Sequence, residues 1–533
     1  MRCKLALALA LATLSVSLAE PPPTCDAADH TCNPRPPVDL SPHPVAQGLL
    51  RSTARLPIRV QAGGAAPRKV AVAYGVCVDA VVPAALALAA LGVDGKAPIA
   101  AVHHAGIASV QQLAETLAYF LSRGAAGERF VPSREVFGAL TAAVDGLEKV
   151  AGGTTYNLGG NAGVIGGRLG RLGGAVLLGA RVSEKAMGVA PAPPRSMKVA
   201  PGVMGEGFVD DIHVILEWQV GEEWGGHVSP RANRFAVHSD LEMPQLQSLQ
   251  GFNQQLKGFG GSMLVLGGFQ VMDGVDYEPP ERRQQLLAEV AAGARAFSAQ
   301  RGGNRVHLEL ASFADNAFIG DLQTHLFPEV HSMGMNEQEL HTLHSFLLSG
   351  EVSLASEARP RVAESLDKLR DIFAQATAKA PKLQRLHLHT LGAQFIVQSC
   401  APDPRNVQSK YSCDWPRMRS AAALASLSAT KYTCADDDAS AIELTPFDGF
   451  DFDNSSTFLL LDGSFSSSLK DGDRRKVSFT ASEPTACWVE GDKRDGDEDE
   501  LHFCVAPQLV CRKPTRTIGA GDVITASGLA AQL

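Results

Sequence analysis

The sequence predicts an α/β protein with a mainly parallel β-sheet, helices on both faces, and a small β-rich lid. From residue 68 onward, short apolar runs alternate with longer helical patterns over several hundred residues. This alternation is typical of strand–helix–strand units that build a parallel sheet. One segment, 210–240, instead alternates apolar and polar residues between turn signals. That pattern indicates antiparallel strands, suited to a small sheet laid over a larger domain.

Length and composition are those of a large soluble protein. The 533 residues are enough for one α/β domain with an insertion, or for two or three domains. Hydrophobic residues make up 45% and charged residues 20%, which is an ordinary balance for a chain that buries a full core. The net charge is −9 and no run of Lys and Arg forms a basic face, so we expect no nucleic-acid partner.

The N-terminal segment has the features of a secretory signal peptide. Arg2 and Lys4 precede an apolar run, and small residues follow at cleavage-like spacing. We therefore expect a signal peptide over 1–19 and a location in the secretory pathway, in the ER lumen or outside the cell. A buried N-terminal helix and a plastid-type transit segment are the alternatives. Residues 20–67 are rich in Pro and predict a mostly unstructured leader before a domain over 68–533.

Two further features concern membranes and disulfides. No later stretch has about 18 uninterrupted apolar residues, so we expect no transmembrane helix. The 10 cysteines lack C-x-x-C spacing, so we expect no zinc site built from them. An oxidising compartment would allow local disulfides between neighbouring cysteines. The candidate pairs are Cys25–Cys32, Cys400–Cys413 and Cys504–Cys511.

The expected elements follow one another in a regular order. A strand over 69–76 comes first, and a helix over 82–92 follows it and ends at Gly92. The later expected elements are strands at 173–180, 259–269, 305–311 and 385–397, with a helix at 279–300 before the third of them. In a parallel sheet, ligands bind at the carboxyl ends of such strands.

Near the end of the chain, the stretch "RTIGAGDVITASGL" (516–529) predicts an anion site beside a carboxylate. Gly519 and Gly521 allow positive φ and a close backbone approach. The amides at the start of the following helix would then point at a phosphate. Asp522 lies beside them and is a candidate general base for phosphoryl transfer. A simple helix N-cap is the alternative interpretation.

Two acidic motifs predict a site for Mg²⁺. Glu309 ends a predicted strand, and "GMNEQEL" brings Asn336, Glu337 and Glu339 to a strand-to-helix junction. Carboxylates at two such edges could position Mg²⁺, which prefers oxygen ligands. The alternative for the second motif is a capped helix start with acids in its first turn.

Two further stretches carry candidate sugar-binding residues. "YNLGGNAGVIGGRLGRLGG" places Gly160 and Asn161 before a glycine-rich helix. Interior glycines cost a helix roughly 1 kcal/mol each, so close packing or a nearby ligand should compensate. The stretch has no G-x-G-x-x-G match, so a dinucleotide site is not supported. Asp79, after the first strand, could hold a sugar hydroxyl or simply cap the next helix.

These motifs, in this order, resemble the ribokinase-like superfamily and, within it, the eukaryotic ADP-dependent glucokinases. The resemblance runs from about residue 68 to the C-terminus. "GAGD" alone is common to sugar and nucleoside kinases, whereas "GEEWG" with "HLELAS" and "NEQEL" is more specific to the ADP-dependent branch. The other matching stretches are "CVD" (77–79), "GAAGERF" (124–130), "GGNA" (159–162), "RANRF" (231–235) and "RLHLHTL" (385–391).

The resemblance implies transfer of the β-phosphoryl group of ADP to the 6-hydroxyl of D-glucose, with Mg²⁺. We expect a monomer, although the sequence itself does not reveal the oligomeric state. Asp522 would be the base, and Glu309, Glu339 and Asp522 would organise the metal ion. The residues implied at the phosphate are Arg516, Gly519, Ala520, Gly521 and Asn336. The residues implied at the sugar are Asp79, Glu128, Gly160 and Asn161. A lid over about 205–245 and parts of 105–160 would exclude water.

Two positions bear on specificity. The family pattern makes an acid at Glu128 favour free glucose, because a carboxylate repels the phosphate of fructose 6-phosphate. Family members usually carry Asn where this chain has Gly75, which puts one sugar contact in doubt. The alternatives are therefore an ADP-dependent phosphofructokinase, an ATP-using sugar kinase, and a non-catalytic protein that binds sugar or nucleotide.

Overall fold

The computed structural model describes most of the chain from residue 67 onward, together with one earlier helix. The described residues are 44–53, 67–189, 196–200, 210–240, 242–300, 303–353, 362–376, 378–390, 392–402, 411–434, 482–490, 500–509 and 518–533. The expected signal peptide lies outside them, as do Cys25, Cys32, Cys511 and Arg516. Among the described residues, no helix combines the length and apolar character needed to cross a membrane.

A large mixed sheet forms the centre of the bigger domain. Its strand order is β17-β18-β15-β14-β13-β12-β11-β1-β5-β6. Neighbouring strands from β14 to β6 are parallel, and β15, β18 and β17 continue the sheet in antiparallel pairing. The strands are β1 (Lys69–Tyr74), β5 (Ala175–Gly179), β6 (Met197–Val199), β11 (Met263–Gly267), β12 (Arg305–Glu309), β13 (Ser332–Asn336), β14 (Arg385–His389), β15 (Ala393–Pro402), β17 (Ala486–Glu490) and β18 (Glu500–Pro507), with β16 (Tyr411–Ser412) paired to β15.

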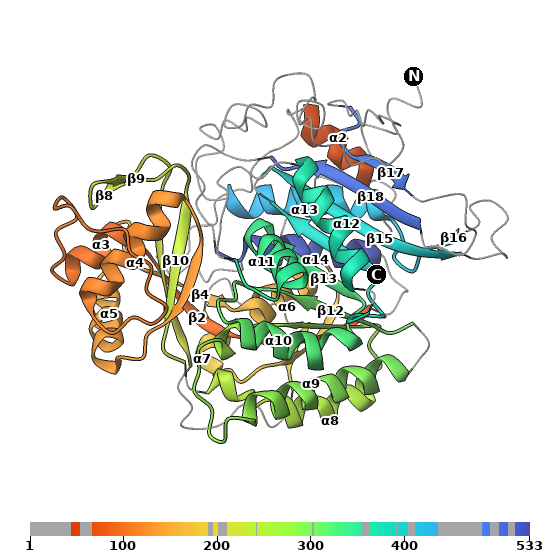
Figure 1. The fold of residues 1–533 in the computed structure, drawn as a ribbon, viewed down its shortest axis with the longest axis horizontal. Coiled ribbons are helices and arrows are strands. Elements are labelled where there is room, and N and C mark those ends of the chain that lie inside the picture. Colours follow the sequence, from red (N-terminus) through yellow and green to blue (C-terminus); the bar gives the residue numbers. More distant parts are fainter. Residues whose placement is uncertain are drawn as a thin grey trace, which may run out of the picture.

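Helices cover both faces of this sheet (Figure 1). Alternate residues of the central strands point to opposite faces, so Ala71 and Ala73 pack in one core cluster and Val70 and Val72 in another. The first face carries α8 (Leu249–Phe259), α9 (Arg282–Ala299), α10 (Asn316–His325), α11 (Glu337–Ser349) and α12 (Val362–Ala376). The second carries α6 (Asn161–Arg171), α13 (Met418–Thr433) and α14 (Ala520–Gln532). Short α7 (Glu184–Met187), η1 (Met243–Gln245), η2 (Phe269–Met272) and η3 (Phe327–Glu329) connect elements. The predicted fold class is confirmed.

One helix lies inside the segment expected to be unstructured. Residues Pro44–Thr53 form α2, and its Val45, Ala46 and Leu49 are buried against α13. The expectation for 20–67 is therefore wrong for these residues. The reason is tertiary: an amphipathic face this short is stabilised by a partner helix nearly four hundred positions away, which local sequence does not reveal.

The small domain is a five-stranded sheet with three helices on one side, seen at the left of Figure 1. Its strand order is β3-β10-β7-β2-β4. The elements are β2 (Cys77–Pro83), α3 (Ala84–Ala90), α4 (Val110–Arg123), β3 (Gly127–Phe130), α5 (Arg134–Gly146), β4 (Thr155–Gly159), β7 (Ile212–Trp218) and β10 (Asn233–His238), with the hairpin β8 (Glu223–Trp224) and β9 (His227–Val228). The expected antiparallel pairing within 210–240 is present as β7–β10. Residues 77–104 also belong to this domain, which is larger than the predicted lid.

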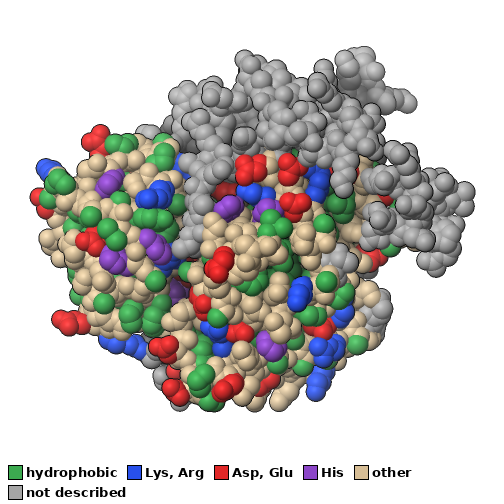
Figure 2. Space-filling model, in the orientation of Figure 1, with side chains coloured by type: hydrophobic (Ala, Val, Ile, Leu, Met, Phe, Trp, Pro, Cys, Tyr) green, Lys and Arg blue, Asp and Glu red, His purple; other side chains and the backbone are tan. Residues whose placement is uncertain are grey.

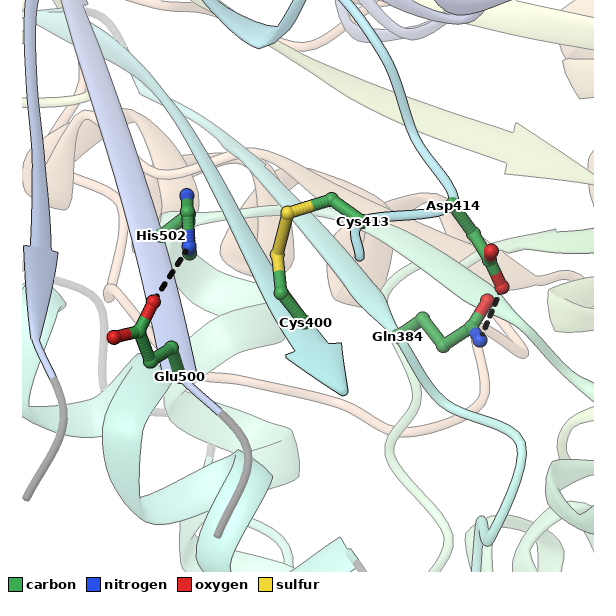
Figure 3. The surroundings of a disulfide bond; sticks show 6 residues. All are labelled: Gln384, Cys400, Cys413, Asp414, Glu500 and His502. Carbon is green, nitrogen blue, oxygen red and sulfur yellow. Dashed lines mark hydrogen bonds and ion pairs between the residues drawn. A yellow bond between two sulfur atoms is a disulfide. The ribbon is translucent and has the colours of Figure 1, made fainter. Parts of the chain in front are cut away.

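Two disulfides stabilise the antiparallel end of the large sheet. Cys400 and Cys413 are bonded, as expected, and Figure 3 shows this bridge beside His502 and Glu500 of β18. Cys504 pairs with Cys487, not with Cys511. The expected Cys504–Cys511 pair is wrong because β17 and β18 pair in a register that sets Cys487 directly opposite Cys504.

On the face of the molecule seen in Figure 2, acidic and basic side chains are interspersed over both domains.

Candidate active site

A cleft of about 690 Å³ lies between the two domains. It is lined by the carboxyl ends of β12, β13 and β14, the start of α14, and the inner face of the small sheet. The described residues that the sequence predicts for catalysis, phosphate, metal and sugar all line it: Asp79, Glu128, Gly160, Asn161, Glu309, Asn336, Glu339, Gly519, Ala520, Gly521 and Asp522. Segments hundreds of positions apart therefore meet in one place.

The glycine turn positions Asp522 at the first turn of α14. Gly519 has φ 73°, a left-handed conformation that disfavours any side chain, and it precedes the helix directly. Asn161 Nδ2 donates a hydrogen bond of 2.8 Å to Asp522 Oδ1, and Gln270 in turn donates to Asn161 Oδ1. Burial, together with the charge of Glu309, raises the pKa of Asp522 to about 7. The carboxyl is thus held in place and about half-protonated near pH 7.

Glu309 is fixed beneath Asp522 by a layer of buried polar side chains. Its two oxygens contact His307 Nε2 at 3.1 Å and His389 Nε2 at 3.2 Å, and Thr525 of α14 donates to it. Burial alone would raise the pKa of Glu309, but the two imidazoles lower it to about 2. Glu309 therefore stays ionised as a fixed negative charge at the floor of the cleft.

Asn336 and Glu339 form a capping box at the start of α11. Asn336 Oδ1 accepts from the Glu339 amide, and Glu339 Oε2 accepts from the Asn336 amide. The structural alternative for this motif is therefore present, and the same residues also line the cleft. Burial raises the pKa of Glu339 to about 7.

The donor set in the cleft fits Mg²⁺. Glu309, Glu339 and Asp522 offer carboxylate oxygens, which are the ligands that this ion prefers. Burial raises the pKa values of Glu339 and Asp522, and the nearby charge of Glu309 raises both further. Since both oxygens of Glu339 already bond Asn336, Glu339 suits a contact through water better than a direct one.

The opposite end of the cleft is formed by the small sheet. Asp79 lies on β2, directly opposite His213 of β7 in the parallel register. It packs so closely against β4 that a Cβ at Gly159 would lie 2.1 Å from its carboxylate. Burial raises the pKa of Asp79 to about 6. A buried acid with little room around it is well suited to accept from a ligand hydroxyl.

Glu128 is the informative residue at this end. One of its oxygens, Oε1, is buried and has no hydrogen-bond partner among the described residues. The imidazole nitrogens of His213 and His238 lie 3.8 Å and 4.0 Å from that oxygen, which is beyond hydrogen-bond range. A buried acceptor without a partner costs about 1–3 kcal/mol, and a ligand hydroxyl would satisfy it.

Comparison with known sequences decides the family. The profile described as the ADP-specific Phosphofructokinase/Glucokinase conserved region matches residues 68–531. The chain belongs to this family. A Bos taurus protein named ADP-dependent glucokinase is 29% identical over 472 residues, which is 87% of this chain and 84% of the relative. A Caenorhabditis elegans protein named probable ADP-dependent glucokinase is 26% identical over 447 residues, covering 79% and 77%.

Solved structures share the fold of this ADP-specific kinase. An ADP-dependent kinase in complex with fructose-6-phosphate and ADPβS superimposes with a TM-score of 0.62 at 16% identity, covering 91% of this chain and 97% of its own. A hypothetical ADP-dependent phosphofructokinase from Pyrococcus horikoshii OT3 gives a TM-score of 0.53 at 14% identity, covering 87% and 97%.

This chain has Gly75 where family members usually carry Asn, and the structure gives a steric reason for the glycine. In this member of the kinase family, the chain at Gly75 runs against the chain at Gly268, and a Cβ on Gly75 would lie 2.8 Å from the Gly268 Cα. A backbone atom cannot move aside as a side chain can, so Asn does not fit at this position here. The backbone of Gly268 and Asn161 therefore fills the space that a side chain at position 75 would need.

Sequence reasoning missed several side chains that line the cleft of this kinase: His213, Arg231, Arg234, Gln270 and His389. Arg234 and His238 lie on one face of β10, and His213 faces them from β7. The alternation of residues along these strands was a usable signal, because every second residue of an antiparallel strand shares a face. The strand pattern does not say which of the two faces of the small sheet turns toward the cleft, because that depends on how the two domains pack together.

Proposed function

We propose that this protein is an ADP-dependent glucokinase, which transfers the β-phosphoryl group of ADP to the 6-hydroxyl of D-glucose and yields glucose 6-phosphate and AMP. The observation that carries the choice of glucose is the buried, unpartnered oxygen of Glu128 at the sugar end of the cleft. A sugar hydroxyl satisfies this carboxylate, whereas a sugar phosphate in its place is repelled. The names of the two curated relatives support the same choice.

In this proposal Asp522 accepts the proton of the attacking hydroxyl. Its raised pKa, about 7, matches the working pH, which is the condition for an efficient general base. The hydrogen bond from Asn161 leaves one carboxylate oxygen for the substrate. Because the protein forms no covalent bond to phosphorus in such a reaction, positioning and electrostatics supply the catalysis.

The transferred phosphoryl group is held by the start of α14. The amides that follow Gly519 have no partner within the helix and point along its axis, where the helix dipole favours negative charge. Arg234 reaches the cleft from β10 and supplies positive charge on the opposite side. The role expected for Arg516 stays a prediction, since that residue is outside the described part of the chain.

Mg²⁺ would be held directly by Asp522, with Glu309 and Glu339 contributing through water, because both oxygens of each glutamate already have side-chain or backbone partners. When bound, the ion neutralises charge on the phosphate oxygens. The chain's own contribution is the fixed negative charge of Glu309, which His307 and His389 hold in one orientation.

The apolar part of the cleft suits the adenine ring. Beside the glycine turn, the lining changes to Val164, Ala429, Leu509, Ile518 and Ile524. An adenine there would lie next to the phosphate site and away from Glu128.

A coupled assay separates the candidate functions. Purified protein is supplied with Mg²⁺, with glucose or fructose 6-phosphate, and with ADP or ATP. Turnover with glucose and ADP alone supports the proposal. Turnover with fructose 6-phosphate or ATP instead would support the alternative kinases, and no turnover in any combination would support a non-catalytic binding protein.

A matched variant tests the observation itself. Glu128→Gln keeps the size of the side chain and removes its charge. We expect a KM for glucose raised by at least tenfold, about 1.4 kcal/mol, and a measurable gain in fructose 6-phosphate use. Glu135→Gln, in the first turn of α5, is the control for a charge change on the same domain.

We also propose a monomer located in the secretory pathway, in the ER lumen or secreted. The disulfides Cys400–Cys413 and Cys487–Cys504 support the location, because disulfides persist in oxidising compartments. Trapping thiols in intact cells before extraction tests it: both pairs should resist labelling. Light scattering of the purified chain tests the monomer.

A further inference from the structure

A cluster of two histidines and an aspartate lies behind the sugar end of the cleft. His213 of β7 and His238 of β10 are directly opposite each other in the antiparallel register, so their side chains share one face of the sheet. Asp240 follows His238 by two positions. All three residues are at least nine-tenths buried. Nothing in the proposed phosphoryl transfer uses His238 or Asp240.

The three side chains converge on one point. His213 Nε2 lies 2.7 Å and His238 Nδ1 lies 3.2 Å from the same Asp240 oxygen, Oδ2. The imidazole rings stack with centroids 4.8 Å apart. One ligand atom from each residue can be chosen so that all three lie within 4.8 Å of one another. A single ion at 2.0–2.2 Å from each atom spans such a set after small side-chain shifts.

One atom of the cluster makes an ion-pair contact but no well-formed hydrogen bond. His238 Nδ1 is buried, lies 3.2 Å from Asp240 Oδ2, and has no hydrogen bond of accepted geometry among the described residues. A second carboxylate, Glu128, faces the two rings from the other side at 3.8 Å and 4.0 Å. The two carboxylates thus offer more acceptor oxygens than the two imidazoles can fill, because a neutral imidazole carries only one N–H.

We propose that His213, His238 and Asp240 bind a transition-metal ion, with Zn²⁺ as the natural occupant. Imidazole nitrogen and carboxylate oxygen form a ligand set that suits Zn²⁺ and related ions, whereas Mg²⁺ prefers oxygen alone. This site is therefore chemically distinct from the carboxylate set around Asp522. Water completes the coordination.

Metal binding at this position fixes which nitrogen of the His213 imidazole carries the proton. With Nε2 on the metal, the neutral imidazole carries its proton on Nδ1, the nitrogen that faces Glu128 Oε1. The ion then orients the sugar end of the cleft without touching the sugar. This consequence for sugar affinity rests on the proposed function, whereas binding of the ion does not.

Calorimetric titration of the full chain with Zn²⁺ tests the site, with Mg²⁺ in excess to occupy the oxygen-rich set. We expect one Zn²⁺ per chain in the wild type. His238→Gln should weaken this binding at least about 100-fold, since even outer-shell changes cost 10–100-fold. His344→Gln is the matched control, because His344 forms a comparable pair with Asp371 at 2.9 Å on the surface; its Zn²⁺ binding should be unchanged.

A spectroscopic measurement keeps the test decisive if His238→Gln does not fold. Co²⁺ bound to the wild type should give the visible absorption of a four-coordinate site, and X-ray absorption of the Zn²⁺ form should count two imidazole ligands. Asp240→Asn should abolish both signals. Absence of a bound Zn²⁺ under excess Mg²⁺, or binding that survives both variants, would overturn the proposal. If the wild type binds Zn²⁺ as expected and both variants lose it, but glucose affinity does not depend on the ion, only the link to the proposed function fails.

Discussion

At the residue scale, the chemistry of the cleft depends on the different surroundings of its carboxylates, which shift their pKa values in opposite directions. Glu309 receives two imidazole contacts that lower its pKa despite its burial, whereas burial and the charge of Glu309 raise the pKa of Asp522 in spite of the hydrogen bond from Asn161. Groups whose pKa values are pushed apart in this way have separate roles as fixed charge and as proton acceptor.

The first prediction concerns Asp522→Asn. The amide cannot accept the hydroxyl proton, so kcat should fall by about 10²–10⁴-fold. Glucose binding, measured by calorimetry, should stay within about threefold of the wild type, because the bond to Asn161 needs only an oxygen. A variant with near-normal kcat would show that another group is the base.

The second prediction concerns pH. A carboxyl with a raised pKa of about 7 is protonated below that pH and cannot act as a base there. The kcat/KM should therefore fall as pH drops below about 7, by nearly tenfold per unit, and level off above it. Asp522→Asn should show a flat residual profile over the same range. A wild-type profile that stays flat between pH 6 and 8 would contradict this assignment.

At the element scale, α14 lies directly on a polar layer instead of an apolar one. The strands beneath it present His307, Arg385, His387 and His389, all buried. Glycines let the helix approach these rings: a Cβ at Gly528 would lie 2.8 Å from the His387 ring. This close contact explains why a terminal helix contains a glycine that helix propensity disfavours.

The third prediction follows from that contact. Gly528→Ala should lower the thermal midpoint, because overpacking against His387 costs about 1–3 kcal/mol. Gly138→Ala in α5 is the matched control, since nothing lies within 4 Å of its added Cβ. That substitution should raise stability by about 0.4–1 kcal/mol. Equal effects of the two substitutions would mean that α14 is not docked as described.

Elements differ in how far the sequence predicts them. The glycine turn and the junction at Asn336 have local signals, so they could be placed from the sequence. The disulfide at Cys487 and the helix α2 could not, because each depends on a partner brought by strand register or by helix docking. His213 falls between these cases: its strand was expected, but its approach to Asp79 requires a parallel pairing of β7 with β2.

At the scale of the whole molecule, the two domains touch through polar contacts at the mouth of the cleft. Arg231 of the small domain forms an ion pair with Glu337, the first residue of α11, at 3.1 Å. Within the small domain the Arg231 guanidinium donates to the Gly124 carbonyl, and across the domains Gln338 reaches the Ala126 carbonyl at 3.5 Å. The contact lies next to the carboxylates that would hold Mg²⁺, so loosening it is expected to disturb that site as well.

The last prediction tests this link. Glu337→Gln removes the partly buried ion pair at a cost of about 1 kcal/mol, which should loosen the closed arrangement. Small-angle scattering without ligands should then show a larger radius of gyration, and the KM for ADP should rise about fivefold, since 1.4 kcal/mol corresponds to tenfold. Glu223→Gln, on an exposed position of β8, controls for the lost charge. Because Glu337 belongs to α11 and Arg231 to the small domain, a change in KM without a change in scattering would place the effect in the cleft itself and not in closure.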